Sequence, residues 1–281
     1  MSDACISFFS CDHFKEHYSV HIESALIVWD RIRRYYLRGI VRAFGKTSFD
    51  VIALALSLHD IGKLTKAYSE GKRFYRHEIF SAYATYSILR DLVGENDLVY
   101  ATATAVMLHH EPIIMKAYVG EYGEKYLTIS NLKRVIEKLT ENSGSSNLLR
   151  PNCDVKTTME HVTNLLIRSG YADHSIKEAV MRFIDNWIKG VNGEELFKTL
   201  KEIIAWSSVM GDPDTLLIRR AKVALLLHPL VVSDSLAANI IRGKGCGGYE
   251  VDEGTFITRR ALDGAEFITD ELIQVIENLL K

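Results

Sequence analysis

VIALALSLHDIGK, residues 51–63, contains an apolar run that ends in His59 and Asp60. Asp50 precedes the run as a candidate N-cap and Gly62 follows it as a stop signal, so we expect a helix over VIALALSLHD, residues 51–60. Because that helix would be apolar on every side, it should lie at the centre of the protein. A histidine and an aspartate are unfavourable in an apolar interior unless a charged partner is present. The stretch therefore predicts a polar site at the end of a buried core helix.

Helical periodicity continues through most of the chain. From Phe14 to Tyr36 the large apolar residues recur at alternating steps of three and four, which predicts an amphipathic first helix. Strand-like alternation is nearly absent, so we expect an all-α fold, a single helical bundle of about eight to ten helices in one domain over residues 1–281. Surface loops are expected at 141–154 and 242–256, the second with a minor β-hairpin at 249–257. Further helices are expected at about 77–93, 97–111, 130–141, 156–170, 175–189, 194–208 and 215–242.

Composition narrows the function classes. The 281 residues carry 34 Lys and Arg against 36 Asp and Glu, and this balance excludes a global basic footprint for nucleic acid. The four cysteines lie far apart without a C-x-x-C pair, which predicts four free thiols and a reducing, cytoplasmic location. The first residues, MSDACISFFSCDHFKEH, have no basic segment ahead of an apolar core, and no apolar run approaches the length that spans a bilayer. We therefore expect neither secretion nor a membrane partner.

Histidines gather at the ends of apolar helices. His21 lies about 60° from the centre of the apolar stripe of the first helix, whereas His17 lies near its edge, so His21 is the better inward candidate. His77 begins a helix of its own. His109 and His110 end another apolar helix, and neighbours on a helix diverge by about 100°, so both cannot point into one apolar core. They can, however, reach two points of one polar site.

Asp234 is the last candidate, because it stands among apolar residues of a predicted core helix. It needs a cationic partner there, and an ion pair with Arg219, Arg220 or Arg242 would suffice. Each candidate alone could be a buried residue with a satisfied hydrogen bond. One shared metal site explains all seven together, and seven ligands suit two open-sided ions bridged by Asp60. The proposed ligands are His21, His59, Asp60, His77, His109, His110 and Asp234.

These residues carry a resemblance to a known family. The order of His21, the pair His59 and Asp60, and Asp234 is similar to the H…HD…D pattern of the HD metal-dependent phosphohydrolase superfamily, and LHDIGK resembles its local signature. The additional histidines resemble the branch that holds two metals. Within that branch, FYRHEIFSA and MLHHE most resemble the CRISPR-associated HD nuclease of type I systems. Since the chain has no G-x-x-x-x-G-K-[ST] nucleotide loop, the resemblance is to the standalone subunit.

The resemblance implies a metal-dependent nuclease that hydrolyses phosphodiester bonds of DNA, single-stranded by preference. It also implies a separate helicase subunit and a surveillance complex as partners. Asp60 would act at the metals, which activate water, and Lys63 would bind a phosphate oxygen or stabilise developing charge. Histidine-rich ligation favours manganese, nickel, cobalt or iron over magnesium.

Two other functions stay open at this point. The chain could be an HD phosphohydrolase or phosphodiesterase that acts on a small nucleotide, or a catalytically inactive metal-binding scaffold. A nuclease must also hold a polyanion, and local basic clusters occur at 31–38, 66–76 and 218–222. We expect 66–76 to face the substrate, because it joins the His59 and Asp60 pair to His77.

Overall fold

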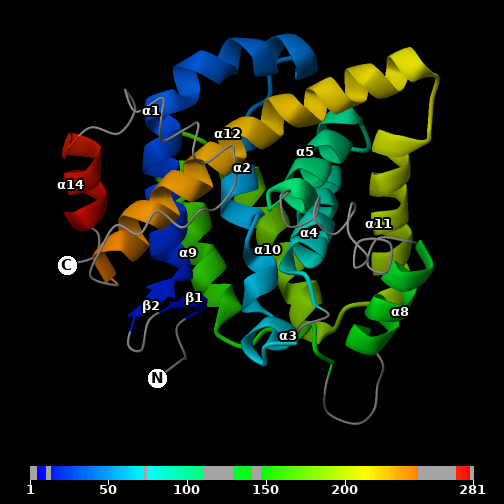
Figure 1. Cartoon of the computed structure of the whole chain (residues 1–281), viewed down its shortest axis with the longest axis horizontal. Helices are drawn as coiled ribbons and strands as arrows, with labels where there is room; N and C mark the ends of the chain where they lie inside the picture. Colours follow the sequence, from blue (N-terminus) through cyan, green and yellow to red (C-terminus); the bar gives the residue numbers. More distant parts are fainter. Residues whose placement is uncertain are drawn as a thin grey trace.

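The structure is a computed structural model that describes residues 5–10, 14–72, 75–110, 129–140, 147–245 and 270–278 (Figure 1). The all-α prediction is confirmed, since the described residues form eleven α-helices and one two-stranded sheet. Nine of these helices correspond to predicted ones, and the short α3 and the terminal α14 were missed. In chain order the elements are β1 (Ile6–Ser10), β2 (Phe14–His17), α1 (Tyr18–Phe44), α2 (Val51–Leu58), η1 (Ile61–Leu64), α3 (Lys66–Ser69), α4 (His77–Val93), α5 (Asp97–Leu108), α8 (Ile129–Thr140), α9 (Val155–Arg168), α10 (His174–Lys189), α11 (Gly193–Ser208), α12 (Pro213–Gly245) and α14 (Asp270–Asn278).

Helix α2 is the buried centre of the bundle, as its composition predicts. All eight of its residues are buried, and α1, α4, α5, α9 and α12 all pack against it. Asp50 caps it by accepting hydrogen bonds from the backbone N–H groups of Ile52 and Ala53. The helix ends at Leu58, two residues before its predicted end at Asp60. Asp60 has a φ of −109°, which is outside the helical range. The aspartate therefore stands in a turn at the inner end of the core helix.

Gly62 allows that turn to touch the start of α4. A Cβ at this position would lie 2.1 Å from the backbone oxygen of His77. The backbone N–H of Gly62 donates to the hydroxyl of Ser81 on α4, and the hydroxyl of Tyr75 donates to the carbonyl of Gly62. Gly62 was predicted to stop the helix, but its main role is this close approach of two backbones.

The N-terminal end of the first predicted helix is wrong. Residues Phe14–His17 form β2, which pairs antiparallel with β1, and α1 begins at Tyr18 and continues to Phe44. The apolar spacing at 14–18 is compatible with a helix or a strand, and pairing with β1 stabilises the strand. The predicted C-terminal hairpin at 249–257 lies outside the described residues. Helix α12 continues to Gly245, so residues 242–245 are helical and not part of a loop.

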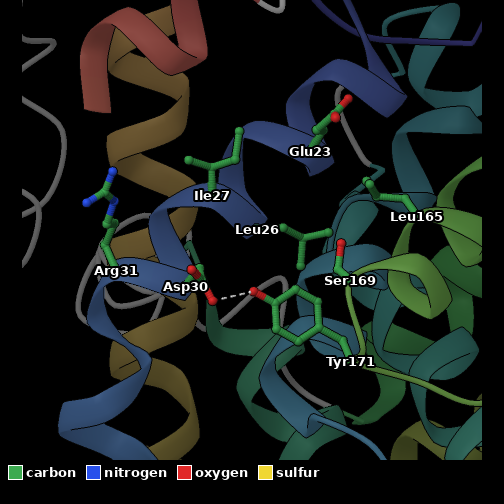
Figure 2. Close-up of a pocket in the computed structure, with 8 residues that line it drawn as sticks. All are labelled: Glu23, Leu26, Ile27, Asp30, Arg31, Leu165, Ser169 and Tyr171. Carbon is green, nitrogen blue, oxygen red and sulfur yellow. Dashed lines mark hydrogen bonds between the residues drawn. The ribbon is translucent and has the colours of Figure 1, made fainter. Parts of the chain in front are cut away.

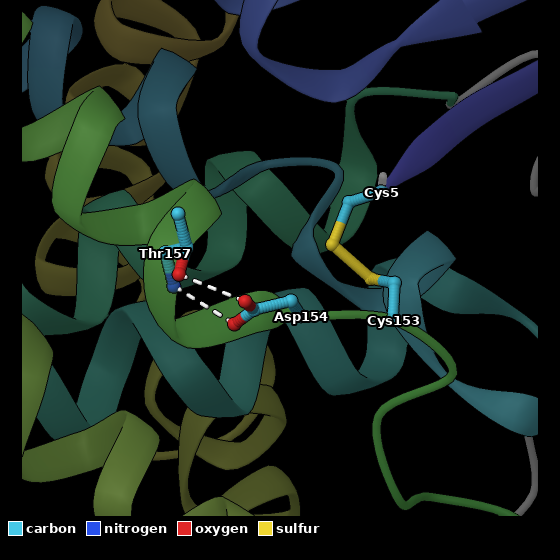
Figure 3. Close-up of a disulfide and its surroundings, with 4 residues drawn as sticks. All are labelled: Cys5, Cys153, Asp154 and Thr157. Carbon is cyan, nitrogen blue, oxygen red and sulfur yellow. Dashed lines mark hydrogen bonds between the residues drawn. A yellow bond between two sulfur atoms is a disulfide. The ribbon is translucent and has the colours of Figure 1, made fainter. Parts of the chain in front are cut away.

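A disulfide joins Cys5 to Cys153, so the prediction of four free thiols is wrong for these two (Figure 3). The two cysteines are 148 residues apart, and a separation of that size gives no spacing signal. The bond ties the start of β1 to the segment that leads into α9, where Asp154 caps the helix by accepting from the backbone N–H and hydroxyl of Thr157. Cys11 and Cys246 lie outside the described residues.

Helix α12 crosses α1 and α2 on a long diagonal in Figure 1. Over Pro213–Ile241 it is long and apolar enough to cross a membrane by length and composition, which the sequence analysis did not expect. However, 67% of its most apolar window is buried inside the protein. The core helix of a globular fold has the same composition, and the contacts of α12 are those of a core helix.

Candidate metal centre

The seven predicted site residues, although far apart in sequence, converge at the inner end of α2. His21 comes from α1 and Asp234 from α12, and His77 is the first residue of α4. The helix predicted to run to 111 ends at Leu108, so both histidines that follow it lie in a turn. The ligand atoms fall into two groups: cluster A, with His21, His59, Asp60 and Asp234, and cluster B, with Asp60, His77, His109 and His110.

Cluster A is buried except for a small part of Asp234 and contains two carboxylates. The Nε2 atom of His21 lies 3.1 Å from Oδ1 of Asp234 and 3.7 Å from Oδ2 of Asp60. The Nε2 atom of His59 lies 3.3 Å and 3.5 Å from the same two oxygens. All four potential ligand atoms lie within 4.8 Å of one another, which is the spacing expected around one ion.

Cluster B lies on the other side of Asp60 and uses its second oxygen. Oδ1 of Asp60 is 3.1 Å from Nε2 of His77 and 3.6 Å from Nε2 of His109. The ring of His110 packs against His77 and His109, with centroid separations of 5.2 Å and 4.1 Å. Asp60 therefore faces both clusters, one carboxylate oxygen to each.

Hydrogen bonds on the far side of the rings fix how several imidazoles point. The Nδ1 atoms of His59 and His109 donate to the backbone carbonyls of Leu56 and Val106 at 2.7 Å and 2.6 Å. A carbonyl oxygen can only accept, so the Nε2 atom of each neutral ring carries a lone pair toward Asp60. These nitrogens face carboxylate oxygens, so either a proton or a metal cation must lie between them.

Unsatisfied buried atoms mark where the cation belongs. Buried polar atoms normally have a hydrogen-bond partner. Within the described part of the chain, five atoms of the two clusters are buried without one: Oδ1 of Asp60 and the Nε2 atoms of His21, His59, His77 and His109. Imidazole nitrogens and carboxylate oxygens are suitable ligands for divalent transition ions. The residues present therefore fit two such ions.

The electrostatics of the site favour bound cations. Burial raises the pKa of Asp60, but Lys63 and His59 more than offset this and hold it well below its ordinary value. Burial lowers the pKa of His21, yet the carboxylates of Glu16 and Asp234 raise it to about 10. Burial together with His109 and His77 holds the pKa of His110 well below its ordinary value. The carboxylates thus stay ionised, and the centre attracts positive charge.

The structure also decides between alternatives for single residues. His17 is exposed at the N-cap of α1, whereas His21 is buried in cluster A. Asp234 does not pair with Arg219 or Arg220, whose side chains donate to the backbone carbonyls of Trp206 and Ser207. The side chain of Arg242 lies outside the described residues.

Lys63 is not a solvated surface lysine. Its side chain is 6% exposed, and its Nζ atom lies 2.6 Å from Oδ2 of Asp60.

Two buried glutamates near the clusters were not predicted from the sequence. Glu16 contacts His21 and Glu78 lies beside His77, and each is less than 3% exposed. An acidic residue next to a helix start is too common for either to have been singled out.

A cavity of about 470 Å³ lies between α1 and the end of α9, where the hydroxyl of Tyr171 donates to Asp30 (Figure 2). None of the seven site residues lines it. Its lining comprises Glu23, Leu26, Ile27, Asp30, Arg31, Leu165, Ser169 and Tyr171.

Comparisons with known proteins identify the family. No protein-family model matches the sequence. The chain is 32% identical over 258 residues to the CRISPR-associated endonuclease Cas3-HD of Thermoproteus tenax, covering 91% of this chain and 96% of that protein. It is 30% identical over 179 residues to the Cas3-HD endonuclease of Methanocaldococcus jannaschii, covering 58% of this chain and 69% of the relative. A solved structure of the CRISPR-associated Cas3 HD domain protein from Methanocaldococcus jannaschii has 26% identity and a TM-score of 0.49, covering 77% of this chain and 95% of that one.

The relative from Thermoproteus tenax matches nearly end to end, and this agrees with the resemblance that His21, LHDIGK and Asp234 carry. These relatives therefore place the chain in a nuclease family, and not in a family of inactive scaffolds or small-nucleotide hydrolases. The chain belongs to the CRISPR-associated Cas3-HD endonucleases and is a metal-dependent HD nuclease.

Proposed function

We propose that this nuclease hydrolyses phosphodiester bonds of single-stranded DNA with two divalent ions, one held by cluster A and one by cluster B. A separate helicase, working with a CRISPR surveillance complex, would supply the unwound strand. The observation that carries the two-ion proposal is the position of Asp60, which directs one oxygen to each cluster. The family membership supports the nuclease chemistry.

The ions, when bound, would supply a water of lowered pKa and neutralise charge on the phosphate. Asp60 would hold both ions at a fixed separation, and its neighbour His59 would complete cluster A. Imidazoles provide five of the seven proposed ligands, and such a set favours manganese, cobalt, nickel or iron over magnesium. The donor atoms therefore support transition ions rather than magnesium at both clusters.

Lys63 would place a permanent positive charge beside the reacting phosphate. Burial lowers the pKa of Lys63, but Asp60 more than offsets this and raises it, so the ammonium stays charged. An ammonium at this point can bind a phosphate oxygen or stabilise the charge that develops on it. We therefore assign Lys63 a catalytic role, together with Asp60.

The limited exposure of the clusters favours a single strand over a duplex. The side chains of His77 and Asp234 are 12% and 11% exposed, and those of His21, His59 and His109 are fully buried. A thin, flexible strand can bring one phosphate to such a site more easily than a stiff double helix can.

The segment 66–76 is the best candidate for holding the strand. It contains the half-buried Tyr68, whose ring lies edge-on to His77 with a centroid separation of 5.7 Å. An aromatic ring at the rim can stack a base, and the partly exposed Lys72, which pairs with Glu70 at 3.1 Å, can contact the DNA backbone. Internal ion pairs do not distinguish the three basic clusters: Arg33 pairs with Asp50 and Lys222 with Asp97, as Lys72 does with Glu70. The contact of Tyr68 with His77 is what favours 66–76.

Cleavage by metal-stripped protein tests the proposal. After EDTA treatment and dialysis, the protein should be inactive, and manganese or nickel should restore cleavage of single-stranded DNA more than of duplex DNA. A His59→Ala/Asp60→Ala double variant should stay inactive with either ion. Turnover of mononucleotides or cyclic dinucleotides without cleavage of DNA would contradict the substrate, and equal activity with magnesium alone would contradict the ligand set.

A further inference from the structure

We propose that Glu16 is a positioning residue of the metal centre, which holds His21 with its Nε2 atom toward cluster A and makes cluster A the tighter of the two ion sites. This inference rests on the proposed two-ion centre. Glu16 belongs to the hairpin of β1 and β2, and none of the proposed ligands comes from that hairpin.

The contact between Glu16 and His21 is short and buried. Oε1 of Glu16 lies 2.7 Å from Nδ1 of His21, and both side chains are fully inaccessible to solvent. Because a carboxylate can only accept, it keeps a proton on Nδ1, so an ion that binds His21 does so at Nε2 and displaces only the proton there. A carboxylate behind a histidine ligand also makes that ligand more basic. Glu16 therefore strengthens the donor that His21 offers.

Three of the other proposed histidine ligands, His59, His77 and His109, have weaker support. His59 and His109 donate to neutral backbone carbonyls. In cluster B, Oε2 of Glu78 is 3.5 Å from Nδ1 of His77, beyond normal hydrogen-bond length, and its other oxygen pairs with Arg76 at 2.5 Å. The charge behind His77 is thus largely neutralised. Cluster A also contains two carboxylates, whereas cluster B has only its share of Asp60.

The hairpin holds Glu16 firmly in place. Glu16 lies in β2 opposite residue 8 of β1, and the hydroxyl of Ser7 donates to its backbone carbonyl at 3.2 Å. The backbone N–H of Tyr18 donates to the carbonyl of Cys5, whose side chain is joined to Cys153 by the disulfide. These links give the carboxylate a fixed position relative to α1, so it can orient His21 without a conformational search.

Glu16→Gln is the informative substitution because it keeps the shape of the side chain and removes the charge. We expect it to lower the affinity for one of the two ions by about 10- to 100-fold, the usual effect of losing a carboxylate behind a histidine ligand. The other ion should bind as in the wild type. Isothermal titration of metal-stripped, full-length protein with manganese gives both affinities.

Ser7→Ala is the matched control, since it alters the same hairpin and leaves the carboxylate. Its two affinities should equal those of the wild type, and the melting temperature of each metal-free variant reports any damage to the fold. Equal manganese affinities in Glu16→Gln and the wild type would overturn the proposal. So would an equal loss of affinity in Glu16→Gln and Ser7→Ala, because Glu16 would then only stabilise the hairpin.

A measurement on the wild type makes the test independent of how the variant folds. In the zinc-loaded protein, long-range ¹⁵N NMR spectra should show His21 protonated at Nδ1 and bound to zinc through Nε2. Zinc bound through Nδ1 would overturn the role of Glu16 and leave the metal centre standing. A wild-type protein that binds no ion at all would overturn the metal centre itself, and this proposal with it.

Discussion

Asp60→Asn should reduce DNA cleavage by a factor on the order of 1,000 or more, because one substitution removes a charged ligand from both ions. The amide can offer one neutral oxygen and turns an N–H group toward the other cluster. It also removes the negative charge that pairs with the buried ammonium of Lys63 at 2.6 Å. Single-turnover cleavage of a single-stranded oligonucleotide in manganese measures the loss, and circular dichroism checks that the variant folds.

Asp30→Asn is a suitable control for that experiment. Asp30 is an exposed aspartate on α1 that accepts a hydrogen bond from Tyr171 at 3.0 Å, away from both clusters (Figure 2). Its substitution should leave the cleavage rate within about twofold of the wild type, since exposed polar contacts contribute little. A folded Asp60→Asn variant that cleaves as fast as Asp30→Asn would contradict the bridging role of Asp60.

Gly62→Ala should cost about 3 kcal/mol of unfolding free energy, at the upper end of overpacking effects. The added Cβ would meet the backbone oxygen of His77 at 2.1 Å and its carbonyl carbon at 2.8 Å, and backbone atoms cannot move aside as a side chain can. The turn would have to separate from α4, which takes His77 away from Asp60. Cleavage should therefore also fall by about 100-fold, as a misplacement of about 1 Å does.

Gly39→Ala is the control for the glycine substitution. Its Cβ would lie 3.3 Å from Cδ1 of Leu225, the flexible end of a side chain, and Gly39 lies inside α1. The gain in helix propensity of about 1 kcal/mol offsets any adjustment. Urea denaturation of both variants gives the comparison, and equal stability of Gly62→Ala and Gly39→Ala would show that the backbone contact is not tight.

The fold was predictable because the core helices are long and strongly patterned. The all-apolar α2 was placed at the centre from composition alone, and its cap at Asp50 was also correct. Errors occurred where local pattern is ambiguous or too short. Phe14–His17 fits a helix or a strand until β1 is present, and the four residues of α3 are too few for periodicity. That residues 1–281 form a single domain stays a prediction.

The proposed ligands could be named from sequence because charged or imidazole side chains at the ends of apolar helices are costly without a shared cation. Their division into two clusters around Asp60 needed the structure. So did Glu16, whose position follows from the pairing of β1 with β2, and the Cys5–Cys153 disulfide, which joins distant segments. No local pattern marks any of these features.

The most direct test of the two-ion centre is anomalous X-ray diffraction from crystals of metal-stripped protein soaked in manganese chloride. The account predicts two anomalous peaks on either side of the Asp60 carboxylate, one among His21, His59 and Asp234 and the other among His77, His109 and His110. A single peak remote from Asp60, in a protein that cleaves DNA only with manganese, would contradict it.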